Sequence, residues 1–127
     1  MKHIKIVLAE DEPTIAAAYL KGLGFHGFDV VLAKNGTEAL AAVSTELPDV
    51  LLLDIIMPHM NGIEVLEALR ASPEHVDLPV IMLTNLGQPE DAERVGELGA
   101  LAYLIKSNLS LKELVEHVRK AAGLPPV

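Results

Sequence analysis

Polar side chains suited to metal and phosphate chemistry follow four short apolar runs of the chain. In chain order they are Glu10 and Asp11, Asp54, Thr84 and Lys106. Three carboxylates placed close together repel one another, and one lysine offsets only part of that charge. A divalent cation would offset the rest, and a set of oxygen ligands selects Mg²⁺ or Mn²⁺ over softer metals. If the fold brings these residues together, we expect a magnesium (or manganese) site.

Asp54 could also react directly. A carboxylate is a competent phosphoryl acceptor and forms an aspartyl phosphate. Phosphoryl transfer needs mainly positioning and charge neutralisation, which a cation, Lys106 and the hydroxyl of Thr84 would supply. Each residue alone has a simpler explanation: Asp54 as a turn cap, Lys106 as a surface lysine. We favour a shared site because the simpler explanations do not predict polar residues at the ends of four strands.

The elements that must position these residues alternate between apolar strands and amphipathic helices. We predict strands at Lys2–Ala9, Phe28–Ala33, Val50–Leu53, Pro79–Thr84 and Leu101–Ile105, and helices near 13–23, 37–46, 62–71, 88–98 and 111–122. Five β/α units in strict alternation indicate an α/β fold with an open, doubly wound parallel sheet. The carboxyl ends of parallel strands share one edge, so the polar residues are expected to meet there.

Some details of the helices can also be predicted. Gly22, Gly24 and Gly27 are expected to end the first helix. Leu47 is expected to face the core, as the last apolar residue of the second helix. The fourth helix has few large apolar residues and is expected to pack weakly.

Composition limits the possible classes of protein. The 127 residues suit one domain, assigned to 1–122, with 123–127 as a short tail or the start of a linker. Cysteine is absent, which excludes disulfides and thiolate metal sites and is compatible with a reducing cytosol. No apolar run has the length of a membrane span and no signal peptide is evident, so we expect a cytoplasmic protein. The net charge of −8 disfavours direct binding of nucleic acid.

Four motifs together resemble the receiver domain of two-component response regulators, over nearly the whole chain. They are Glu10-Asp11-Glu12, Asp54-x-x-Met57-Pro58-x-Met60-x-Gly62, Leu83-Thr84 and Tyr103-Leu104-Ile105-Lys106. The resemblance implies a flavodoxin-like strand order of 2-1-3-4-5, which makes the second strand an edge and brings the other four strand ends together.

The resemblance also implies a phosphorylation site. Asp54 would receive a phosphoryl group from the phosphohistidine of a sensor histidine kinase or phosphotransfer protein. Asp11 and Asp54 would ligate Mg²⁺ together with the backbone carbonyl of Ile56, and Glu10 would act mainly through a water. Thr84 would contact a phosphoryl oxygen.

Further roles implied by the resemblance concern signal output. Lys106 would pair with another phosphoryl oxygen, and Tyr103 would turn inward as Thr84 moves toward the phosphate. The change would reach a downstream protein or effector domain through the face formed by helix four, strand five and helix five. The protein would be a switch and not a turnover enzyme, either a monomer or a phosphorylation-dependent dimer.

Some residues depart from the family pattern. Ser107 stands where many members have a proline after a cis peptide, and Asn85 stands where a small residue is common. At the expected pocket mouth, Ile56 and Leu86 are apolar and cannot orient an attacking water by hydrogen bonding. We therefore predict slow spontaneous loss of phosphate.

Three other classes of protein are compatible with parts of this pattern. An aspartyl-phosphate phosphatase would need an acid where Ile56 stands, and a flavodoxin-like cofactor binder would need a phosphate loop where the acids Glu10 and Asp11 stand. The third is a pseudo-receiver, a binding module that acts without phosphorylation. It is the most serious rival because Asn85 and Ser107 could alter the pocket.

Overall fold

Strands and helices alternate along the chain, in a computed structural model that describes residues 3–85 and 88–125. The strands are β1 (Lys5–Ala9), β2 (Asp29–Ala33), β3 (Val50–Asp54), β4 (Val80–Thr84) and β5 (Ala102–Ile105). The helices are α1 (Pro13–Phe25), α2 (Gly36–Glu46), α3 (Gly62–Arg70), α4 (Pro89–Glu97) and α5 (Leu111–Ala121), with a 3₁₀ turn η1 (Lys106–Asn108) after β5.

The strands form one parallel sheet in the order β2-β1-β3-β4-β5, so the expected fold class and strand order are confirmed. β3 is central: Leu52 pairs with Leu8 of β1 and with Ile81 of β4. Every residue of β3 and β4 is buried. A strand covered on both faces has to be apolar throughout, which makes the polar residues that end these two strands, Asp54 and Thr84, exceptional.

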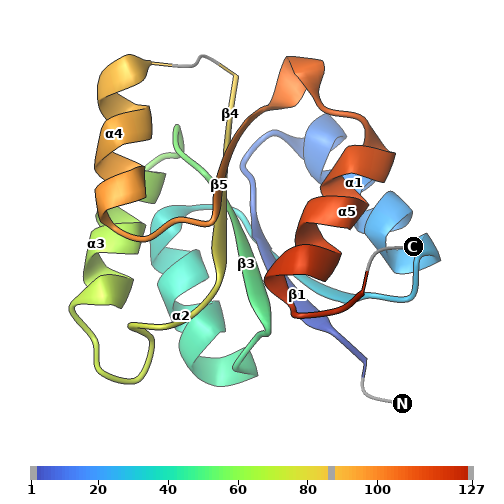
Figure 1. Cartoon of the computed structure of the whole chain (residues 1–127), viewed down its shortest axis with the longest axis horizontal. Coiled ribbons are helices and arrows are strands. Elements are labelled where there is room, and N and C mark those ends of the chain that lie inside the picture. The colour runs from blue at the N-terminus through green and yellow to red at the C-terminus, as the bar shows by residue number, and fades with distance from the viewer. Residues whose placement is uncertain (1–2, 86–87, 126–127) are drawn as a thin grey trace.

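Helices cover both faces of the sheet (Figure 1). α2, α3 and α4 lie on one face, over a core that includes Leu53 and Met82. α1 and α5 lie on the other face, over a core that includes Leu52 and Ile81. Successive side chains of a strand point to opposite faces, so one apolar strand supplies both cores. The helices thus leave the ends of the strands as the place for polar residues.

Local signals start the helices. The side chains of Asn35, Asn61 and Ser110 each accept a hydrogen bond from the backbone N–H three residues ahead. These caps satisfy N–H groups that have no partner inside the helix. Pro13 and Pro89 occupy the first turns of α1 and α4, where a missing N–H is tolerated.

Two expectations about the helices are wrong. Gly22 and Gly24 lie within α1, which continues to Phe25; of the three glycines only Gly27, with φ of 87°, follows the helix. Leu47 is 71% exposed and does not face the core. The chain leaves α2 at Leu47 in the left-handed conformation, with φ of 49°, and this reversal of the backbone carries the side chain outward.

The expected small apolar face of α4 is confirmed, because Val95 is its buried residue.

The chain stays on the domain after α5. The N–H groups of Gly123 and Leu124 donate to carbonyls of the helix, and Leu124 packs against the core. The first residues of the expected tail therefore pack on the domain. Within the described ranges, no helix combines the length and the hydropathy needed to cross a bilayer.

Candidate functional site

Four buried polar or charged residues mark the carboxyl edge of the sheet. Over residues 3–85 and 88–125, the buried members of this class are Glu10, Asp54, Thr84 and Lys106. Each ends or directly follows one of four adjacent strands, β1, β3, β4 and β5. β2, at the outer edge, contributes none. The structure therefore places the residues where the parallel arrangement predicts them.

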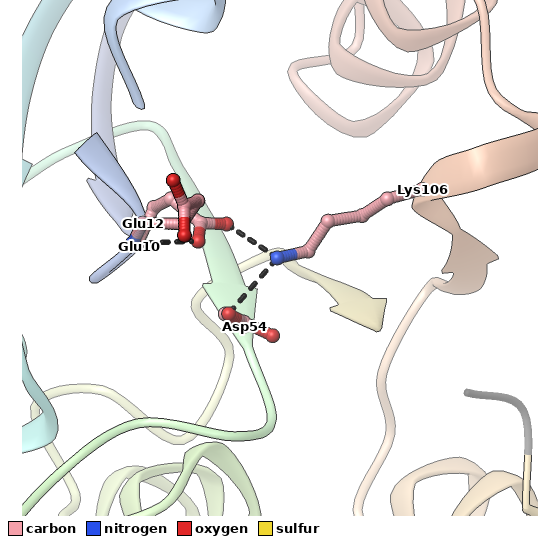
Figure 2. A network of polar contacts seen from close by, with 4 residues as sticks. All are labelled: Glu10, Glu12, Asp54 and Lys106. Carbon is pink, nitrogen blue, oxygen red and sulfur yellow. Dashed lines mark hydrogen bonds and ion pairs between the residues drawn. The ribbon is translucent and has the colours of Figure 1, made fainter. Parts of the chain in front are cut away.

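Lys106 connects two of the carboxylates. Its Nζ donates to Oε2 of Glu10 at 2.6 Å and to Oδ2 of Asp54 at 2.9 Å. Figure 2 shows the amine between the two carboxylates, reached from the end of β5. The other carboxylate oxygen of Glu10 accepts the N–H of Glu12 at 3.1 Å. The three side chains are at most 6% exposed, so water screens these contacts little.

Burial shifts the pKa values of two groups in this cluster. Burial is the largest cause that raises the pKa of Glu10 above 4.5, and the charge of Asp54 adds to it, although hydrogen bonds from Lys106 and from the Glu12 N–H act in the opposite direction. For Lys106, burial alone would lower the pKa, but the hydrogen bonds to Glu10 and Asp54 outweigh it and raise the pKa above 10.5. One permanent positive charge therefore serves two carboxylates.

The acidic residues fit a divalent cation. One oxygen each from Glu10, Asp11 and Asp54 lie within 4.8 Å of one another, and Asp11 is exposed while the other two are buried. Three carboxylates against one lysine leave excess negative charge, and the donors are all oxygens. The chemistry of this donor set suits Mg²⁺ or Mn²⁺. Ile56, whose backbone carbonyl is expected as a further ligand, lines the same cavity.

An open cavity of about 580 Å³ lies over Asp54. Its lining residues are Glu10, Asp11, Glu12, Thr14, Ile15, Asp54, Ile56, Asn85 and Lys106. Ile56 and Asn85, expected at the mouth, are both exposed; Leu86 lies outside the described residues. The sequence analysis does not predict that Thr14 and Ile15 line this cavity. The signal that could have indicated it is their position in the first turn of the helix that follows the acidic residues.

The connection between β3 and α3 holds the backbone of Asp54 in place. The N–H of Gly62 donates to the carbonyl of Ile55 at 2.8 Å. A Cβ at Gly62 would collide with the carbonyl oxygen of Asp54 and would lie 2.9 Å from Cα of Ile55. The glycine of the Asp54 motif is thus required by close backbone approach. A capping box of Asn61 and Glu64 starts α3 at the same point.

Tyr103 and Ser107 flank the end of β5. The hydroxyl of Tyr103 accepts the N–H of Gln88 at 3.1 Å and donates to the Gln88 carbonyl at 3.5 Å, which ties β5 to the start of α4. Tyr103 is partly buried against the core. Ser107 lies in η1, and the described part of the chain has no cis peptide bond. The Lys106–Ser107 bond is therefore trans.

Comparisons with known proteins agree with this geometry. The family model of the response regulator receiver domain matches residues 6–119. The response regulator MprA of Mycobacterium tuberculosis is 36% identical over 118 residues, which cover 91% of this chain and 49% of MprA. The chain thus spans about half the length of the curated relatives it matches.

Solved structures show the same likeness. The Francisella response regulator 1452 receiver domain superimposes with a TM-score of 0.86 at 30% identity, over 95% of this chain and 98% of that one. The signal receiver domain of a histidine kinase from Syntrophus aciditrophicus gives 0.84 at 32% identity, over 94% and 89%. Sequence, strand order and the acidic strand ends all agree, and this chain belongs to the response regulator receiver domain family of two-component signalling.

Proposed function

We propose that this receiver domain is a phosphorylation switch in which Asp54 accepts a phosphoryl group from the phosphohistidine of a sensor histidine kinase or phosphotransfer protein. One observation carries the proposal. The Asp54 carboxylate ends a buried strand, lines an open cavity, and is held by Lys106 at 2.9 Å within a cluster of carboxylates. A carboxylate in that setting has positioning, a neighbouring cation and access for a donor.

The transfer exchanges one bond for another. An oxygen of Asp54 bonds to phosphorus as the bond from phosphorus to the imidazole nitrogen of the donor breaks, and the electron pair stays on that nitrogen, which takes up a proton. Mg²⁺ (or Mn²⁺), held by Asp11, Asp54, the carbonyl of Ile56 and, through water, Glu10, would neutralise charge on the phosphoryl oxygens.

The residues of this chain then stabilise the product. The amine of Lys106 already contacts Asp54 and would pair with a phosphoryl oxygen, while the hydroxyl of Thr84, at the end of the neighbouring strand β4, would donate to another. Lys106 is in contact with Asp54 before the reaction, so its pairing with the phosphoryl group would cost little reorganisation. The protein is then its own phosphorylation catalyst without being a turnover enzyme.

The change caused by phosphorylation would be transmitted to a partner through the surface formed by α4, β5 and α5. Tyr103 sits on β5 and holds the first residue before α4, so a movement of Thr84 toward phosphate would free or draw in this side chain. The partner would be a downstream protein or effector domain, reached by a monomer or by a phosphorylation-dependent dimer. The net charge of −8 argues against direct binding of nucleic acid by this domain.

We expect the phosphoryl group to be lost slowly. Ile56 lines the cavity and is 64% exposed, so its apolar side chain covers part of the mouth without a group that could orient water. Ile56→Asn, which introduces a polar side chain at the cavity mouth, is expected to shorten the half-life of the phosphorylated form several-fold. The decay of the phosphoprotein measures this, and equal half-lives in the two proteins would sink the idea.

Intact-mass spectrometry after incubation with acetyl phosphate tests the proposed function. A phosphoryl adduct that requires Mg²⁺ and disappears in Asp54→Asn is expected. If no adduct forms under conditions that label another receiver domain, the chain is a pseudo-receiver, and Asn85 at the cavity mouth and Ser107 after Lys106 become the residues to examine.

A further inference from the structure

Arg70, at the end of α3, donates hydrogen bonds to backbone carbonyls of two other chain segments. Its Nε donates to the carbonyl of Leu98 at 2.7 Å and its Nη2 to that of Gly99 at 3.3 Å, both just after α4. Its Nη1 donates to the carbonyls of Leu78 and His75, at 2.9 and 3.2 Å, in the connection from α3 to β4. The guanidinium of Arg70 therefore connects three parts of the chain: α3, the loop between α3 and β4, and the C-terminal end of α4.

This arrangement differs from an ordinary surface ion pair. Among the described residues, no carboxylate forms an ion pair with Arg70, although Asp77 is near enough for its charge to act on the guanidinium. Burial lowers the pKa of Arg70, and the carbonyl contacts are what replace its lost water. The guanidinium reaches the four carbonyls with N–H groups on three nitrogens, whereas the three N–H groups of a lysine share a single atom.

The rest of α4 is held much less firmly. Val95 is its buried residue, and Arg94 pairs with Glu67 of α3 at 2.6 Å through side chains that are both 44% exposed. Exposed pairs of this kind contribute little. At the N-terminal end, the described contact to the sheet is that of Gln88 with the Tyr103 hydroxyl. Among the described residues, the two ends of α4 thus have different attachments: the partly buried guanidinium of Arg70 holds two carbonyls at the C-terminal end, and the Tyr103 hydroxyl contacts Gln88 at the N-terminal end.

We propose that Arg70 is a pivot for α4: it fixes the C-terminal end of the helix, so that the state of the site at Asp54 moves the N-terminal end, where the described hydrogen bonds to the sheet are those of Gln88 with the Tyr103 hydroxyl. The coupling to Asp54 rests on the proposed function. The clamp itself does not, because its contacts are present without phosphate. Arg70 is a positioning residue that makes α4 tilt about one end instead of shifting as a whole or unfolding.

Residue-resolved hydrogen exchange tests the pivot. The Ala92 N–H, bonded to the Gln88 carbonyl, reports on the N-terminal end, and the N–H groups of Leu98, Gly99 and Ala100 report on the C-terminal end. Addition of acetyl phosphate and Mg²⁺ to the native protein should change exchange at Ala92 by on the order of tenfold, and at the C-terminal reporters much less. Equal changes at both ends would overturn the pivot.

Variants separate a pivot from a merely stabilising contact. Arg70→Lys keeps the charge and most of the stem but cannot reach all four carbonyls. It should form the Asp54 adduct as the native protein does, yet exchange faster at Leu98, Gly99 and Ala100 even without phosphate, and spread the phosphate-dependent change over all of α4. Arg94→Gln, which removes the exposed charge, should behave like the native protein. A native pattern in Arg70→Lys would contradict the proposal.

The mass of each sample distinguishes the two possible failures. An adduct without an end-specific response overturns the pivot and leaves the proposed function intact. Absence of an adduct overturns the proposed function and the coupling to Asp54, while faster exchange in unphosphorylated Arg70→Lys would still establish the clamp.

Discussion

At the scale of single residues, the decisive feature is that Lys106 is shared between Glu10 and Asp54. The ionised form of Glu10 is electrostatically unfavourable here, because its carboxylate is buried and shares the positive charge of Lys106 with Asp54. The raised pKa of Glu10 expresses that cost. Removal of a partner from a buried cluster is generally more damaging than its presence is stabilising.

The pH dependence of stability should reveal Glu10. Its pKa is higher in the folded than in the unfolded protein, so the folded state binds this proton more tightly. Its contribution is therefore fully present below pH 4.5 and is lost as pH rises through the raised pKa. The unfolding free energy of native protein minus that of Glu10→Gln, from urea titrations at several pH values, should fall over this window. A difference that is independent of pH, or that grows with pH, would refute the assignment.

At the level of helices and their connections, replacement of two different glycines by alanine should change the free energy of unfolding in opposite directions. Gly62→Ala places a methyl group against the backbone of Asp54 and Ile55 and is expected to destabilise the protein by about 1–3 kcal/mol. Gly24→Ala, inside α1 with open space around it, should stabilise by about 0.5–1 kcal/mol. Urea unfolding measures both, and the acetyl phosphate reaction should be impaired only in Gly62→Ala. Loss of stability in Gly24→Ala would show that α1 is not helical there.

The end of α2 offers a second test at this scale. Leu47 is exposed in the left-handed region, which costs a β-carbon residue roughly 1 kcal/mol. Leu47→Gly should therefore raise the unfolding free energy by about 0.5–1 kcal/mol. Leu101→Gly is the matched control, because Leu101 is 60% exposed but does not have positive φ. It should be neutral or destabilising, and an equal gain in both variants would exclude the conformational explanation.

At the scale of the whole molecule, the acidic edge should couple metal binding to folding. The chain carries a net charge of −8, and three of its carboxylates converge at one place only when the sheet is formed. Mg²⁺ should thus bind the folded state and stabilise it by about 1.4 kcal/mol at ten times its Kd. Thermal unfolding with and without Mg²⁺, at matched ionic strength, measures this.

Asp11→Asn provides the control for metal binding. It removes an exposed ligand and one repulsive charge, so without metal it should be at least as stable as the native protein, and Mg²⁺ should no longer raise its melting temperature. If Mg²⁺ stabilises both proteins equally, the cation acts by general screening and not at the acidic cluster.

The alternation of strands and helices and the carboxyl-edge location of Asp54, Thr84 and Lys106 could be predicted from the sequence alone. These follow from local rules: apolar runs make buried strands, and a polar residue that ends such a run has to lie at the sheet edge. The family and the strand order came from the likeness of four motifs to receiver domains, and the family model and the sheet confirm them.

The contacts that the side chains share become visible only in the folded protein. Lys106 meets Glu10 and Asp54 across 96 and 52 residues of chain, and Arg70 reaches carbonyls 28 and 29 residues away. Such contacts depend on strand order, side-chain length and the angle of each helix on the sheet, none of which a local pattern encodes. Leu47 shows the same limit, since the apolar period continued past the point where the backbone reversed. The sequence thus defines which residues reach the edge, and packing defines which of them touch.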